Sequence, residues 1–223
     1  MGVSGKENDR HDHYFKKARS EHYRARSVYK LKEIQAQFRL LSRGDCVVDL
    51  GAAPGSWSQY AAEVVGTSGR VVAVDRTPIE AGLPAQVTRL QLDMLEVSPE
   101  VLQTAAGVER ADVVISDMAP NTSGIRSVDH ARSIELCRKA LQVAERLLLP
   151  KGAFVCKVFQ GGDVQPLQQE LRERFAQVKI FKPKSSKDES VETFLVAMGF
   201  RGAVTTSGDE ATPGGGWDPL QDL

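Results

Sequence analysis

The sequence is poor in features that mark secreted, membrane-bound or zinc-binding proteins. It has three cysteines, Cys46, Cys137 and Cys156, without any C-x-x-C pair, so neither a disulfide framework nor a zinc ribbon is expected. No apolar run approaches the roughly 20 residues that span a bilayer, and the first residues lack a signal-peptide pattern. We therefore expect a cytoplasmic protein with no bound metal and no membrane contact.

The sequence also lacks net charge, having 29 basic and 29 acidic residues, which by itself argues against a nucleic-acid partner. The charges are unevenly distributed along the chain. Residues 1–44 hold 11 Lys and Arg against 5 Asp and Glu, whereas residues 202–223 hold four acids and no base. The basic start is either a solvated helix face or a surface for nucleic acid, and charge alone leaves both open.

The 223 residues fit one globular domain with two tails. We assign residues 1–26 to a basic N-terminal leader, residues 27–200 to the folded domain, and residues 201–223 to an acidic, glycine-rich and disordered tail. No oligomeric partner is indicated by the sequence.

Within the domain, short apolar segments alternate with segments of helical period. Helices are predicted over residues 27–39, 57–65, about 134–148 and 164–175, with a short one capped by Ser98. Near-continuously apolar strands between helices indicate a mostly parallel α/β sheet of seven strands with helices on both faces. The last two strands form an antiparallel hairpin at one edge. The strands are predicted at 46–50, 70–74, 87–92, 111–116, 153–159, 177–181 and 191–198.

Ligands of such sheets bind at the carboxyl ends of the strands, and acids and glycines gather there. The loop 49–59 has Gly51 and Gly55 for tight turning but neither the G-x-G-x-x-G nor the Gly-Lys-Ser/Thr pattern. The second strand ends at Asp75, which suits ribose hydroxyls, and the third ends near Asp93, which suits an adenine amino group. A ribose-bearing ligand without pyrophosphate fits, and S-adenosylmethionine is favoured.

Two later strands carry charges where apolar residues are expected. Lys157 interrupts the strand 153–159 near its carboxyl end, and Asp117 follows the strand before it. Adjacent parallel strands would bring the two side by side over the cofactor cleft. Glu192 and Lys30 are two further charges that can converge there.

Together these segments resemble the FtsJ/RlmE methyltransferases, over about residues 12 to 200. Several motifs match in order, although Ser56 stands where a second glycine is common and the tail has no counterpart. The matching segments are Asp49–Gln59, Asp117–Asn121, Lys157–Gly161, and Ser185-Ser186 followed by Glu192.

The resemblance implies a Rossmann-like methyltransferase fold and S-adenosylmethionine-dependent methylation of a ribose 2′-hydroxyl. Bacterial members of this size act on a uridine in the A loop of 23S ribosomal RNA, in the large subunit. The resemblance places a catalytic tetrad on Lys30, Asp117, Lys157 and Glu192. It places cofactor contacts on Gly55, Trp57, Asp75, Asp93 and Asp117.

Transfer to a ribose hydroxyl requires removal of its proton. A lysine is normally protonated at neutral pH, so Lys157 acts as the base only if the site favours its neutral form. Burial and Lys30 favour that form, whereas Asp117 and Glu192 oppose it. A charged Lys157 would instead orient the hydroxyl and stabilise the developing alkoxide, and both roles stay open.

Other functions fit less well or stay as alternatives. Cytosine C5 methylation needs a thiol, but Cys156 precedes Lys157 on a strand and points to the opposite face. A transfer-RNA anticodon loop as substrate, or a ribosome-assembly factor that binds RNA, is not separated from the ribosomal RNA enzyme by sequence. A small-molecule methyltransferase is the least favoured alternative, because the basic residues of the leader would then have no function. With an RNA substrate, phosphates would contact Lys16, Lys17, Arg19, Arg24, Arg26, Lys182, Lys184 and Lys187.

Overall fold

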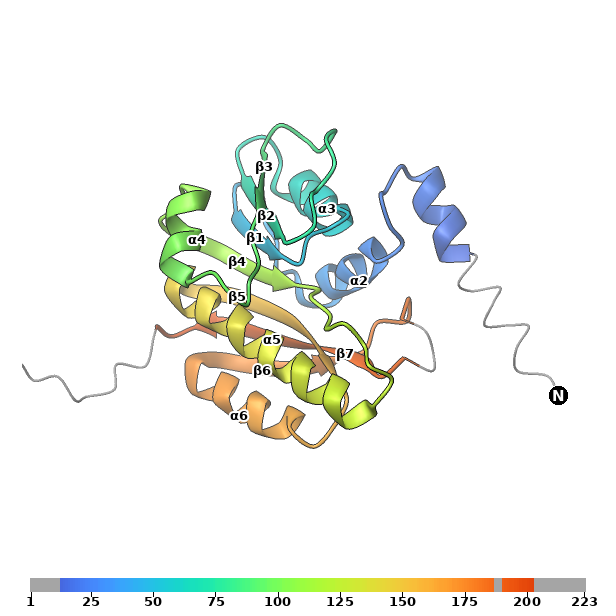
Figure 1. Ribbon diagram of the computed structural model, residues 1–223. Coiled ribbons are helices and arrows are strands. Elements are labelled where there is room, and N and C mark those ends of the chain that lie inside the picture. Colours follow the sequence, from blue (N-terminus) through green and yellow to red (C-terminus); the bar gives the residue numbers. More distant parts are fainter. Residues whose placement is uncertain (1–12, 187–189, 203–223) are drawn as a thin grey trace, which may run out of the picture.

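Seven strands form one sheet in the computed structural model, which describes residues 13–186 and 190–202 (Figure 1). They are β1 (Cys46–Leu50), β2 (Arg70–Asp75), β3 (Val87–Gln91), β4 (Ala111–Ser116), β5 (Leu148–Phe159), β6 (Phe175–Phe181) and β7 (Glu192–Phe200). Their order across the sheet is β3-β2-β1-β4-β5-β7-β6. Strands β1 to β5 run parallel, whereas β7 is antiparallel to both β5 and β6. The predicted α/β class and its antiparallel edge hairpin are confirmed.

Helices cover both faces of the sheet. Helices α2 (Val28–Phe38) and α3 (Ser56–Val65) pack on one face, and α4 (Pro99–Ala106), α5 (Arg126–Leu147) and α6 (Val164–Arg174) on the other. Because side chains alternate along a strand, β5 directs Val155 to the α2–α3 face and Phe154 and Cys156 to the α5 face. Across the described residues, no helix combines the length and apolarity needed to cross a bilayer.

Two elements are longer than the sequence predicts. Helix α5 begins at Arg126 rather than near residue 134, because its first two turns are mostly polar and give no apolar period. Asp129, in the first turn of α5, accepts hydrogen bonds from the backbone N–H groups of Ser123 (2.7 Å) and Gly124 (3.1 Å). These bonds hold the chain that leads into the helix. Strand β5 begins at Leu148, ahead of the predicted residue 153, and its register with β4 shifts in that segment.

The described part of the predicted leader, residues 13–26, packs on the domain. Residues 13–20 are helical, and Ala18 is buried against α2. The Gln59 side chain on α3 donates to the His22 carbonyl (3.0 Å). The folded unit therefore includes chain that precedes residue 27.

The predicted tail begins on the sheet edge. The backbone N–H of Arg201 donates to the Arg174 carbonyl (2.8 Å), next to the end of α6. The prediction of disorder for residues 203–223 lies outside the described residues, as does the assignment of residues 1–12 to the leader.

Candidate active site

Charged residues from three strands meet at the carboxyl edge of the parallel strands. Asp117 follows β4 directly, and Lys157 lies two residues before the end of β5. Strand β7 is antiparallel to β5, so it begins at this edge, and Glu192 pairs with Phe159. The reversal of β7 thus places Glu192 beside the carboxyl ends of β4 and β5.

These side chains share the face of the sheet that α2 covers. Lys157 is two positions from Val155, and Glu192 is two positions from Phe194; both apolar residues belong to the core under α2 and α3. Alternation along the strands therefore directs Lys157 and Glu192 to that face. Helix α2 contributes Lys30, which is 9% exposed.

The four side chains form a chain of close charges that we call the tetrad: Lys30, Asp117, Lys157 and Glu192. The Lys157 ammonium Nζ donates to Asp117 Oδ1 (2.8 Å) and to the Asp117 carbonyl (2.6 Å). Lys30 Nζ lies 4.0 Å from the same Oδ1 and 2.6 Å from Glu192 Oε1. Every tetrad side chain is 15% exposed or less. Lysines and acids alternate along the tetrad, so each side chain lies against a partner of opposite type, which reduces the cost of burial.

Glu192 is held in its charged form. Burial disfavours the carboxylate, but the Lys30 ammonium and the hydrogen bonds from Lys30 and Ser186 outweigh it, so the pKa of Glu192 is lowered. The Ser186 hydroxyl donates to Glu192 Oε1 at 2.9 Å. The Ser185-Ser186 segment thus supports the tetrad.

Asp49 is a fully buried acid on β1, next to β4. Its Oδ2 accepts from the Ser58 hydroxyl (2.6 Å), and its Oδ1 has no hydrogen-bond partner among the described residues. Burial raises the pKa of Asp49 to about 7, and the charges of Asp117 and Asp75 add to the rise while Ser58 opposes it. Asp49 therefore gains or loses its proton near neutral pH.

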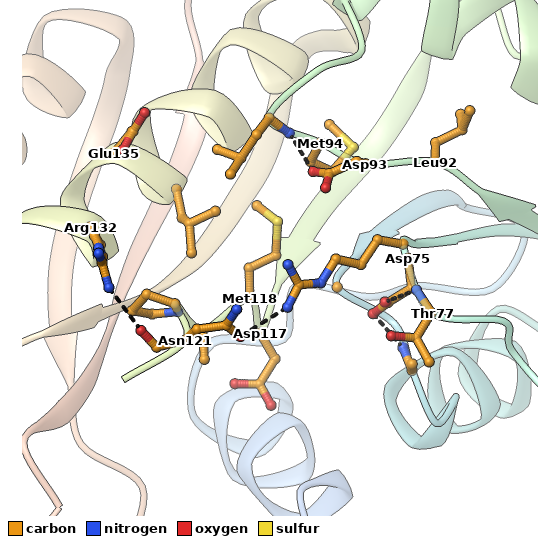
Figure 2. A pocket seen from close by; sticks show the side chains of 17 residues that line it. Asp75, Thr77, Leu92, Asp93, Met94, Asp117, Met118, Asn121, Arg132 and Glu135 are labelled. Carbon is orange, nitrogen blue, oxygen red and sulfur yellow. Dashed lines mark hydrogen bonds between the residues drawn. The ribbon is translucent and has the colours of Figure 1, made fainter. Parts of the chain in front are cut away.

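Beside the tetrad lies a cavity of about 580 Å³, lined by the ends of β2, β3 and β4 and by α5 (Figure 2). Asp75, Asp93 and Asp117 all line it, so the structure brings together three of the acids that the sequence singles out. Gly51 also lines the cavity and has φ of 77°, and an added Cβ there would lie 2.6 Å from the Met118 side chain. The glycine is required for this close approach.

Backbone amides hold the two outer acids of the cavity. Asp75 Oδ2 accepts from the Ala53 N–H (2.9 Å), and its Oδ1 accepts from the Thr77 N–H (2.7 Å). Asp93 Oδ1 accepts from the Leu95 N–H (2.9 Å). Each carboxylate oxygen has a second lone pair, so these acids can still accept from a ligand.

Gly55 and Trp57, both predicted cofactor contacts, are not among the residues that line this cavity. Gly55 has φ of 105° and is the N-cap residue that precedes α3. The Trp57 ring is 2% exposed and packs 5.7 Å from the Phe194 ring, and its Nε1 donates to the Ser27 carbonyl (2.8 Å). A contact of Gly55 or Trp57 with the cofactor stays a prediction.

Two arginines that the sequence analysis missed line the cavity and contact Asn121. Arg76 Nη2 donates to the side-chain oxygen of Asn121 (2.9 Å), and Arg132 Nη1 donates to the Asn121 carbonyl (3.2 Å). Both arginines line the cavity, and Figure 2 shows the contact with Arg132. Arg76 follows the strand-end Asp75 directly, which is the one sequence signal that pointed to it.

Some predicted phosphate ligands also have partners within the protein. Arg24 donates to the carbonyls of Pro54 (3.2 Å) and Ala81 (2.5 Å), which ties the leader to the loop after β1. Arg26 donates to the Ser185 carbonyl (3.5 Å). Their guanidinium groups position loops around the site, and Lys187 lies outside the described residues.

Known proteins with similar sequences are methyltransferases. A family model described as FtsJ-like methyltransferase matches residues 23–200. The ribosomal RNA large subunit methyltransferase E of Nitratidesulfovibrio vulgaris strain DP4 is 53% identical over 199 residues, which covers 89% of this chain and 98% of that protein. The protein of the same name from Halorubrum lacusprofundi is 48% identical, covering 89% and 74%.

The fold comparison agrees with the sequence comparisons. A crystal structure of a Plasmodium falciparum protein assigned as a ribosomal RNA methyltransferase superposes with a TM-score of 0.70 at 25% identity. The match covers 81% of this chain and 100% of that one.

Proposed function

Because the chain belongs to the FtsJ-like methyltransferase family, we propose that it is an RNA methyltransferase that uses S-adenosylmethionine to methylate a ribose 2′-hydroxyl of large-subunit ribosomal RNA. The observation that carries the proposal is the buried tetrad beside a cavity with three carboxylates. The names of the similar proteins support ribosomal RNA as the substrate.

The cavity residues fit S-adenosylmethionine. Asp75 and Asp93 offer acceptors for ribose hydroxyls and for an adenine amino group. The bound cofactor supplies a methyl group on a positively charged sulfur.

The geometry around Lys157 suits a base. A neutral amine has two N–H groups and one lone pair, and the carbonyl and carboxylate of Asp117 accept both N–H groups. The lone pair is then left to take the proton of the ribose hydroxyl. In a charged Lys157 a third N–H would point there and stabilise the developing alkoxide.

The other tetrad members orient this amine. Asp117 fixes the direction of Lys157 through two hydrogen bonds. The Lys30–Glu192 pair lies beside Asp117 and balances its charge. We therefore assign Lys157 to proton removal or alkoxide stabilisation, Asp117 to its orientation, and Lys30 and Glu192 to steering of substrate and lysine.

We place the modified nucleotide, a uridine, in the A loop of 23S ribosomal RNA on the large subunit, in the cytoplasm. The described residues form one domain built on a single sheet, and we infer that the shape of the subunit selects the site. Phosphate contacts supply affinity rather than sequence choice. We assign these contacts to the basic side chains of residues 16–26 and of the late loop: Lys16, Lys17, Arg19, Arg24, Arg26, Lys182, Lys184 and Lys187.

In the direct test, the purified protein is incubated with radiolabelled S-adenosylmethionine and, separately, with each of three substrates. These are large subunits from a strain that lacks the enzyme, naked ribosomal RNA, and transfer RNA. We expect label on subunit RNA, mapped to a ribose 2′-oxygen in the A loop. Lys157→Ala should abolish the label, whereas Lys179→Ala, on the exposed edge strand β6, should not.

The other outcomes separate the alternatives. Label on transfer RNA alone would keep the chemistry and overturn the ribosomal target. No label on any RNA, together with rescue of subunit assembly by Lys157→Ala in the deletion strain, would favour an RNA-binding assembly factor.

A further inference from the structure

The end of β5, which carries Lys157, extends beyond its parallel neighbour. The pairing of β4 with β5 ends at Ser116 opposite Cys156, whereas the pairing of β7 with β5 continues to Glu192 opposite Phe159. Residues 157–159 therefore have a strand partner on one side only. Their backbone groups on the β4 side need other partners, because an unpaired buried backbone group is costly.

Helix α5 supplies those partners from one face. Cys137 Sγ donates to the Lys157 carbonyl (2.9 Å), and the Ser133 hydroxyl accepts from the Phe159 N–H (3.1 Å). His130 Nδ1 lies 2.9 Å from the Phe159 carbonyl, which can only accept, so Nδ1 carries a proton. His130, Ser133 and Cys137 are three and four residues apart, which aligns them along one side of the helix.

The histidine also fixes the turn that follows. Its Nε2 accepts from the Asp163 N–H at 3.3 Å. A Cβ added at Gly161 would lie 2.5 Å from the His130 ring, so the turn runs directly against the ring. His130 thus joins α5 to the chain both at Phe159 and beyond it.

We propose that His130, Ser133 and Cys137 are positioning residues that hold the Lys157 segment in place for methyl transfer. This inference rests on the proposed function. The three side chains act on the backbone of Lys157 and of Phe159, which is the partner of Glu192 in the sheet. They therefore fix two tetrad members without touching the tetrad side chains.

The proposal has a physical consequence for rate. Lys157 Nζ sits within 2.8 Å of both Asp117 acceptors, and a displacement of its backbone would carry the amine out of that geometry. Misplacement of a reacting group by about 1 Å can reduce a rate by about a hundredfold. Loss of the α5 contacts should thus lower the rate of transfer more than the affinity for cofactor, because Asp75 at the end of β2 and Asp93 after β3 are held by backbone amides outside α5.

Paired variants test this inference. Cys137→Ala removes the donor to Lys157, whereas Cys137→Ser keeps one; His130→Leu removes the donor to Phe159, whereas His130→Asn keeps an N–H near the Nδ1 position. Ser133→Ala is matched by Ser127→Ala, at an exposed serine of the same helix. For each purified full-length variant, the measurements are the single-turnover methyl-transfer rate, the affinity for S-adenosylmethionine, the melting temperature, and amide hydrogen exchange over residues 154–163.

We expect each disruptive variant to lower the transfer rate about tenfold, with cofactor affinity within about threefold of the unmodified protein. Cys137→Ser, His130→Asn and Ser127→Ala should stay near the unmodified rate. Exchange at the Phe159 amide should accelerate in Ser133→Ala and not in Ser127→Ala.

Two results would overturn the inference. One is faster exchange at residues 157–159 with an unchanged transfer rate. The other is a rate loss that tracks the melting temperature and is not restored by Cys137→Ser or His130→Asn, which would make the three residues merely structural. If the unmodified protein methylates no RNA at all, the proposed function fails, whereas exchange at Phe159 still reports whether the contacts hold the strand.

Discussion

The carboxyl edge of the sheet contains two groups of acids whose partners differ in kind. On the cavity side, Asp75 and Asp93 accept hydrogen bonds from backbone amides. On the tetrad side, Asp117 and Glu192 are held by lysine side chains. Backbone amides stay in place when a neighbouring side chain is replaced, whereas a paired lysine does not. Asp75 and Asp93 should therefore keep their positions when the tetrad is changed, while changes within the tetrad should affect its other members.

Lys157→Ala should show this difference most strongly. It removes the amine that faces the substrate and leaves the cavity acids in place, so we expect the methyl-transfer rate to fall by about a thousandfold, within the range of general-base catalysis. Cofactor affinity, measured by calorimetry, should change less than about threefold. A loss of cofactor binding equal to the loss of rate would contradict the independence of the two sides.

Asp49→Asn tests the buried acid behind the tetrad. Because the pKa of Asp49 is raised to about 7 in the folded protein, folding binds a proton, and the protein loses stability as pH rises from its ordinary value near 4 through 7. The Asn variant should lack this loss, so its advantage in free energy of unfolding should grow with pH to about 4 kcal/mol near pH 8.

Urea unfolding at a series of pH values measures this effect. Glu109→Gln, at an exposed position, is the matched control and should leave the pH dependence of the unmodified protein unchanged. Parallel stability curves for Asp49→Asn and the unmodified protein would show that Asp49 keeps an ordinary pKa.

Asp75→Asn should weaken cofactor binding in the cavity and leave the tetrad unchanged. An amide has one acceptor oxygen and a donor group, so it can satisfy only one of the two N–H groups of Ala53 and Thr77. We expect cofactor affinity to fall about tenfold to a hundredfold, as for the loss of a hydrogen bond to a charged group. The transfer rate at saturating cofactor should stay nearly normal; a large fall in that rate with unchanged affinity would place Asp75 in the chemistry instead.

The coupling within the tetrad gives the smallest effect. Lys30→Met and Glu192→Gln each remove one member of the same pair, so the double variant should be less impaired than the sum of the single losses. We expect a coupling of about 1–2 kcal/mol in the transfer rate, typical of residues in contact. Strictly additive losses would show that the 2.6 Å contact of Lys30 with Glu192 does not matter for transfer.

Much of the fold and of the site can be predicted from the sequence because their signals are local. Apolar runs identify the strands, and the two-residue alternation along β5 correctly separates Cys156 from Lys157. Asp75, Asp93 and Asp117 are recognisable because parallel strands end at one edge. Such reasoning does not extend to long-range partners: the charge of Arg24 gives no sign that its guanidinium donates to two backbone carbonyls.

The sequence by itself determined the alternation of strands and helices, the face to which each strand residue points, and the charged residues available for chemistry, since these follow from backbone geometry and residue type. Only the tertiary structure decided which partner each charge takes. Lys30 comes from α2, Glu192 from the reversed strand β7, and the contacts that hold the end of β5 from α5. Such pairings depend on how elements that are distant in sequence pack together. A contact between distant elements produces no periodic pattern along the chain, so it cannot be predicted from the sequence pattern.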